Sequence, residues 1–170
     1  MRPVPCRVKI AGLLLVAACA TTSFNGREFH DGRVHFVLSA LPGTYRRVDL
    51  PRASLAFSDE NQGASILMNG RCGGKDEDTP LVALTNHLLI GTTERQIQAQ
   101  EVEPFDSREA LHSVLTAKLD GVPRLYDMFV IKKDGCIYDF VYVASPSAAE
   151  AGRREFERLI RAVHLVPEPL

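Results

Sequence analysis

The sequence lacks tryptophan, has few aromatic side chains (7%) and carries no excess of charge of one sign. Its 20 basic residues stand against 21 acidic ones, which gives a formal net charge of −1. Binding to the phosphates of a nucleic acid needs a basic surface, so we expect no nucleic acid partner. The 170 residues, of which 45% are hydrophobic, are enough to bury the core of one globular domain.

Motifs of known catalytic chemistry are also missing. The sequence has neither the Gly-x-Ser-x-Gly nor the Ser-x-x-Lys pattern of serine nucleophiles. The glycine-rich stretch Gly70–Lys75 lacks the glycine spacing, and the Ser or Thr after lysine, of a phosphate-binding loop. The five histidines have no zinc-type spacing. We therefore predict no enzyme and no resident cofactor or metal, and only a metal site assembled by folding stays open.

Residues 1–18 have the pattern of an export signal. Three basic residues precede an apolar run over residues 10–18, which is too short to span a bilayer. Val16-Ala17-Ala18-Cys19 resembles the lipobox of bacterial lipoproteins. That resemblance implies cleavage before Cys19 and its acylation with chains such as palmitate, which would anchor the protein in a membrane. An ordinary secretory signal is the alternative.

The signal divides the chain into three predicted parts: a signal peptide over residues 1–18, a lipidated tether over residues 19–33, and one globular domain over residues 34–167. Ala20, rather than Asp, follows Cys19, and in enteric-type lipoproteins this resembles a residue that permits transfer to the outer membrane. We expect the protein in the bacterial cell envelope, anchored in the outer membrane and facing the periplasm.

The four cysteines are predicted to differ in their chemical state in the mature protein. Cys6 leaves with the signal and Cys19 carries lipid, so Cys72 and Cys136 remain as a pair in an oxidising compartment, where a disulfide is expected. Two buried free thiols are the alternative. Arg71 and Lys75 flank Cys72, which is the best hint in the sequence of a reactive thiol.

The stretch 124–163 has the clearest structural pattern. Two runs rich in aromatic and β-branched residues flank Asp134-Gly135, a strong signal for a β-hairpin, and both runs are apolar on both faces. A sheet covered on each side is therefore expected. Asp127 and Asp139 interrupt the two strands; they mark either a polar pocket on one face or, more commonly, carboxylates near an edge or loop.

Other elements follow by similar signals. Short strands are expected between residues 34 and 69, a helix over Pro80–Ile90 with Thr79 as its N-cap, and strands over 96–103, 110–119 and 122–132. Ser147 and Glu150 fit a capping box for a final helix, whose apolar stripe is formed by Phe156, Leu159, Ile160 and Val163.

This order of elements, with Leu41-Pro42-Gly43 after the first strand and Asp120-Gly121-Val122-Pro123 before a long strand, resembles the PsbP-like superfamily. The resemblance implies an α+β fold, an α/β/α sandwich around a central antiparallel sheet, that ends in a hairpin and a packed amphipathic helix. It also implies a non-catalytic role in assembly or interaction.

We predict a lipid-anchored envelope protein that acts as a binding or assembly module for a protein partner. One alternative is a small-ligand carrier with a pocket between sheet and helix, suggested by the aromatic face of Tyr138, Phe140 and Tyr142. Another is a thiol-redox protein that uses Cys72 and Cys136.

Overall fold

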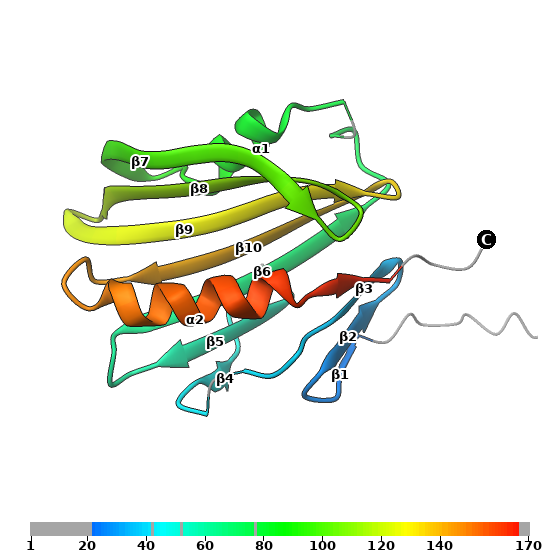
Figure 1. Ribbon diagram of the computed structural model, residues 1–170, viewed down its shortest axis with the longest axis horizontal. Coiled ribbons are helices and arrows are strands. Elements are labelled where there is room, and N and C mark those ends of the chain that lie inside the picture. Colours follow the sequence, from blue (N-terminus) through cyan, green and yellow to red (C-terminus); the bar gives the residue numbers. More distant parts are fainter. Residues whose placement is uncertain (1–21, 42, 52, 77, 167–170) are drawn as a thin grey trace, which may run out of the picture.

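The computed structural model describes residues 22–166 except 42, 52 and 77 (Figure 1). It contains two helices, α1 (Leu81–Leu88) and α2 (Ala149–Arg161), and two antiparallel sheets. The strands are β1 (Ser23–Phe24), β2 (Glu28–Asp31), β3 (Val34–Val37), β4 (Arg46–Val48), β5 (Leu55–Asp59), β6 (Ala64–Cys72), β7 (Thr92–Phe105), β8 (Arg108–Leu119), β9 (Val122–Lys133), β10 (Cys136–Ala144) and β11 (His164–Leu165).

The larger sheet has seven strands in the order β4-β5-β6-β10-β9-β8-β7. The predicted hairpin turns are confirmed, since Asp120 and Gly121, and likewise Asp134 and Gly135, all have positive φ. Such two-residue turns match the right-handed twist of the strands that they join. They place β9 and β10 at the centre of the sheet, with β7 at an edge.

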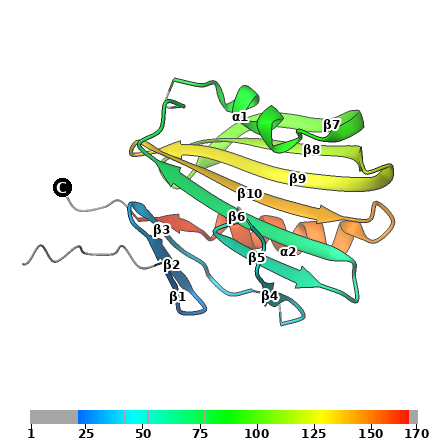
Figure 2. The same ribbon diagram turned by 180° about the vertical axis from the view of Figure 1, so that it is seen from behind.

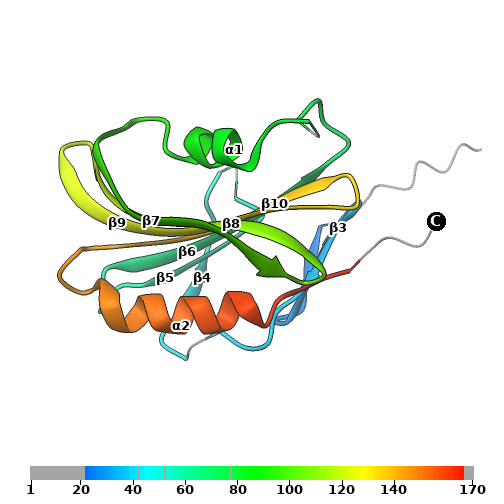
Figure 3. The same ribbon diagram turned by 45° about the horizontal axis from the view of Figure 1, so that its top comes forward.

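The sheet lies between the two helices (Figure 3). Beneath α2, one large core joins Phe129 and Phe140 of the sheet to Phe156 of the helix, and all three side chains are fully buried. On the opposite face, α1 packs through Leu84 against Val130 and Ile137. A strand that is apolar on both faces is thus covered on both, and the predicted α+β sandwich is confirmed.

The smaller sheet, with the order β1-β2-β3-β11, extends the layer that contains α2 (Figure 1). Its Phe29 and Phe36 rings stack with centroids 5.0 Å apart and belong to the core beneath α2. Residues 23–31 therefore differ from the predicted tether over 19–33: they form a hairpin of the folded body. Four residues connect the paired Phe24 and Phe29, and the side chain of Asn25 accepts hydrogen bonds from the backbone N–H groups of Arg27 and Glu28 in this turn.

Both predicted helix caps are wrong. The N-cap of α1 is Pro80 rather than Thr79, and that of α2 is Ala148, and neither makes a side-chain capping bond. Ser147 instead shares a hydrogen bond between side-chain hydroxyls with Ser145, 3.0 Å away. The apolar stripe predicted for α2 is confirmed, because all four of its side chains are buried in the core.

Candidate functional site

Asp127 and Asp139 lie in the two central strands, so neither is near an edge or loop as the sequence suggested. Both carboxylates are buried. They also do not share a face: Asp127 pairs across the strands with Tyr142 of the α2 layer, whereas Asp139 pairs with Val130 beneath α1. Each face of the sheet thus has its own buried carboxylate.

Asp139 forms the polar wall of a cleft between α1 and the sheet. The cleft has a volume of about 350 Å³ and is lined by Arg71, Asp76, Leu84, His87, Leu88, Val130, Ile137 and Asp139. Asp139 accepts a hydrogen bond from Asn69 at 2.7 Å and pairs with Arg71 at 3.4 Å. Burial raises the pKa of Asp139 above its ordinary value, and the Asn69 and Arg71 contacts offset only part of that rise.

Exposed apolar side chains gather on the same face. In the described part of the chain, seven large apolar side chains are exposed: Leu50, Val82, Ile90, Ile97, Val102, Leu119 and Val122. Val82 and Ile90 belong to α1 and the turn after it. Ile97 and Val102 pair with Leu115 and Leu111, which lie on the α1 face of β8. Leu119 and Val122 share that face, so six of the seven form what we call the α1 face surface.

On the other face, Asp127 accepts a hydrogen bond from Nε2 of His112 at 2.8 Å. The imidazole stacks on Phe129, with centroids 4.1 Å apart. Burial by itself lowers the pKa of His112, but the hydrogen bond and charge of Asp127, with the charges of Glu103 and Glu157, outweigh it and raise the pKa.

Two arginines of α2 complete this charged group. Arg153 lies 2.7 Å from Glu157 and 3.6 Å from Asp127, and Arg161 donates to Glu103 at 3.0 Å. The group thus connects strands β7, β8 and β9 to the helix. Sequence reasoning missed it because its members come from three strands and α2, although Glu101 and Glu103 two residues apart on a strand predict one shared face.

The aromatic face that suggested a ligand pocket is filled. Tyr138, Phe140 and Tyr142 are 3%, 0% and 0% exposed, because β3 and α2 cover them. Tyr142 donates from its hydroxyl to the carbonyl of Ala149 at 3.3 Å. Where the structure describes the chain, packing thus leaves these three side chains no room for a ligand, and the cleft between sheet and helix lies beneath α1 instead.

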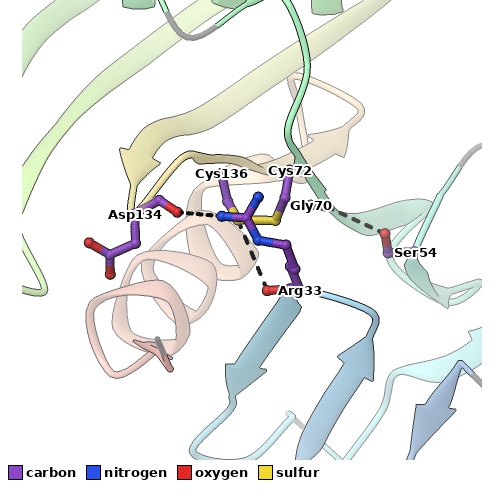
Figure 4. Close-up of a disulfide and its surroundings, with 6 residues drawn as sticks. All are labelled: Arg33, Ser54, Gly70, Cys72, Asp134 and Cys136. Carbon is purple, nitrogen blue, oxygen red and sulfur yellow. Dashed lines mark hydrogen bonds between the residues drawn. A yellow bond between two sulfur atoms is a disulfide. The ribbon is translucent and has the colours of Figure 1, made fainter. Parts of the chain in front are cut away.

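Cys72 and Cys136 form the predicted disulfide (Figure 4). They are direct partners across β6 and β10, so Cys72 ends a strand and does not lie in a loop. Nearby, Arg33 donates to the carbonyl of Asp134 at 3.1 Å. The bond thus fastens two central strands beside the smaller sheet. Around it, the described contacts give no support to a thiol-redox role, and the predicted lipidation site Cys19 lies outside the described residues.

No protein-family model matches the sequence, and no curated protein matches it. Solved structures do match. Cyanobacterial PsbP (CyanoP) from Synechocystis sp. PCC 6803 superposes with a TM-score of 0.58 at 13% identity, over 92% of this chain and 99% of that protein. The fold is PsbP-like.

Two further solved structures resemble this chain in fold. LpqN of Mycobacterium tuberculosis, described as involved in cell envelope biogenesis, has a TM-score of 0.57 at 13% identity, over 79% of this chain and 86% of LpqN. A protein of Bacteroides thetaiotaomicron has a TM-score of 0.57 at 9% identity, over 85% of this chain. The chain spans only 50% of that protein's length. At these identities the likeness establishes the fold alone.

Proposed function

We propose that this protein is a lipid-anchored module of the cell envelope that binds a protein partner through the α1 face surface. The main observation behind this proposal is that, among the described residues, six of the seven exposed large apolar side chains lie on this one face. Apolar side chains exposed together on one face are costly to leave in water and are typical of a surface that another molecule covers. The surface also reaches β7, an edge strand whose outer backbone groups can accept an added strand.

The proposed location of the protein in the cell envelope is inferred from the N-terminal sequence. The lipobox-like Val16–Cys19 favours a lipid anchor, and the envelope protein LpqN has the same fold. Within the described residues, neither helix has the length and apolar character needed to cross a membrane. We propose an outer-membrane anchor at Cys19 with the body in the periplasm. Labelling of cells with a palmitate analogue should mark the wild type and not Cys19→Ala.

We also propose that the role is non-catalytic. The buried His112–Asp127 pair is flanked by carboxylates and arginines, and in the described residues no serine or thiol nucleophile lies within hydrogen-bond distance of the imidazole. His112 therefore has no nucleophile to activate. Beneath the packed helix, its proposed role is to stabilise the buried charge of Asp127 rather than to take part in group transfer.

A photo-crosslinker placed in cells at Ile97 or at Arg154 tests the partner-binding role. Position 97 lies on the α1 face surface, whereas Arg154 is equally accessible on α2. The proposal expects one envelope protein to be captured from position 97 and not from 154. Equal capture from both positions, or none from either, would contradict it.

A second candidate function is that of a small-ligand carrier, and the observation that favours it is the cleft beneath α1. An apolar floor with a few convergent polar groups is typical of a ligand site. Replacement of the floor residue Val130 by Phe should fill the cleft and abolish retention of any bound small molecule. Mass spectrometry of the purified wild type with no retained molecule would remove this candidate.

A further inference from the structure

The open side of the α2 layer, where β7 passes the end of the helix, brings three metal-ligating side chains together. Glu101 and Glu103 of β7 and His112 of β8 each present a ligand atom, and these atoms lie within 4.8 Å of one another. The two-residue turn at Asp106-Ser107, with positive φ at both residues, sets this register and places Glu101 opposite His112. The grouping therefore follows from the hairpin itself.

The imidazole of His112 is oriented as a metal ligand would be. In the neutral imidazole, donation from Nε2 to Asp127 fixes the tautomer and leaves Nδ1 with a free lone pair. Nδ1 faces Oε2 of Glu103 at 3.9 Å, which is beyond hydrogen-bond distance, although the side chain is only 10% exposed. In metal sites, the ring nitrogen of a histidine that does not bind the metal commonly donates its hydrogen to a carboxylate, as Nε2 does here.

Charge and unsatisfied oxygens point to a missing cation. Among the described residues, the carboxylates of Glu101, Glu103, Asp127 and Glu157 meet the guanidinium groups of Arg153 and Arg161 and the imidazole of His112. The buried Oε1 of Glu103 has no hydrogen-bond partner there, whereas Oδ2 of Asp127, which also lacks one, faces Arg153 at 3.6 Å. A buried carboxylate oxygen without a partner is unfavourable, and a bound cation would supply one.

We propose that Glu101, Glu103 and Nδ1 of His112 bind a divalent first-row transition-metal ion such as Zn²⁺. One nitrogen and two carboxylate oxygens suit this class of ion, and the exposed side of Glu101 leaves a position for water. Of the two carboxylate oxygens of Glu103, Oε2 accepts from Arg161 and faces Nδ1, and Oε1 has no hydrogen-bond partner among the described residues. Asp127 is the positioning residue that orients the imidazole.

Calorimetric titration of the purified mature protein in detergent with ZnCl₂ tests the site. The wild type should bind one Zn²⁺, and Glu101→Gln should weaken binding at least tenfold. Glu101 is exposed, so this variant should fold. Glu109→Gln removes the same charge from an exposed position outside the group, and it should bind within twofold of the wild type.

Long-range ¹H–¹⁵N spectra of the histidines give an independent test. Zn²⁺ should shift Nδ1 of a single histidine, and that signal should be missing in His112→Gln. No saturable binding by the wild type, equal weakening by Glu101→Gln and Glu109→Gln, or a shift at another histidine would each overturn the proposal. The site faces away from the α1 face surface, so these results do not depend on the proposed partner.

Discussion

The two faces of the seven-stranded sheet are covered to very different extents. One face meets α2 and the smaller sheet in a single core that contains most of the buried aromatic side chains (Figures 1 and 2). The other face meets the eight residues of α1 and Leu89 after it, and its buried apolar residues fall into two small clusters. A cleft and the α1 face surface occupy the remainder of that face.

This difference separates the surface that stabilises the fold from the surface proposed to bind a partner. The face under α2 has no room for a ligand where its aromatic side chains pack, so substitutions there should unfold the protein. The face under α1 presents apolar surface that the fold does not use, so substitutions there should change binding and leave the fold intact. The following predictions test that division.

The largest expected effect is at the centre of the α2 layer. Phe156→Ala removes a fully buried ring that stacks on Tyr142 and should lower the free energy of unfolding by about 3–5 kcal/mol. Val82→Ala, on the exposed side of α1, should change it by less than about 0.5 kcal/mol. Urea unfolding measures both values, and similar losses in the two variants would break the comparison.

Loss of the disulfide should rank second. The Cys72–Cys136 bond closes a loop with a sequence separation of 64, and chain entropy gives it a stabilisation of roughly 4 kcal/mol, less any native strain. The double variant Cys72→Ser/Cys136→Ser should lose about 2–4 kcal/mol. Dithiothreitol should destabilise the wild type similarly and leave the variant unchanged. An unchanged unfolding midpoint in the variant would show that the bond contributes nothing.

Gly152 should show how closely α2 lies on the sheet. Alanine in a helix interior is normally favoured over glycine by about 1 kcal/mol. A Cβ on Gly152, however, would lie 2.4 Å from the hydroxyl of Tyr142, so Gly152→Ala should instead destabilise by about 1–2 kcal/mol. Gly43→Ala, where a Cβ meets nothing within 4 Å, is the matched control and should be nearly neutral. Stabilisation by Gly152→Ala would contradict this packing.

Asp139, in the cleft beneath α1, should make the free energy of unfolding weakly dependent on pH. Because its pKa is raised in the folded protein, its contribution to stability is full below the unfolded pKa of about 4 and is lost as pH rises through the folded value. Asp139→Asn should therefore gain stability relative to the wild type as pH rises above about 4. Urea unfolding across pH 4–7 measures this, with Asp49→Asn, at an exposed position outside the cleft, as control. A constant or falling difference would contradict it.

The central hairpin and the layered fold were predictable because local signals agreed with tertiary structure. Asp134-Gly135 fixed a turn, and strands apolar on both faces required two covering layers. Residues 23–31 were missed because their strands are only two and four residues long, too short for a clear alternation of apolar residues. β11 has only two residues as well, and it pairs with β3 across most of the chain.

The two buried aspartates show why site geometry was harder to predict than the fold. The sequence showed that both residues interrupt apolar strands. The side of the sheet on which each carboxylate lies, however, depends on the register of β9 and β10. The grouping of Glu101 with His112 depends on a turn at Asp106-Ser107, which lacks the glycine of a strong hairpin signal. The α1 face surface could not be predicted either, because exposure follows from how short α1 is relative to the sheet.

The binding of the captured envelope partner to purified variants tests the central claim most directly. Ile97→Glu places a charge in the α1 face surface and should weaken affinity at least tenfold, or about 1.4 kcal/mol, without changing stability. Arg154→Glu, on the exposed side of α2, should bind within twofold of the wild type. Equal weakening by both variants, or weakening by Arg154→Glu alone, would contradict the division of the sheet into a structural face and a binding face.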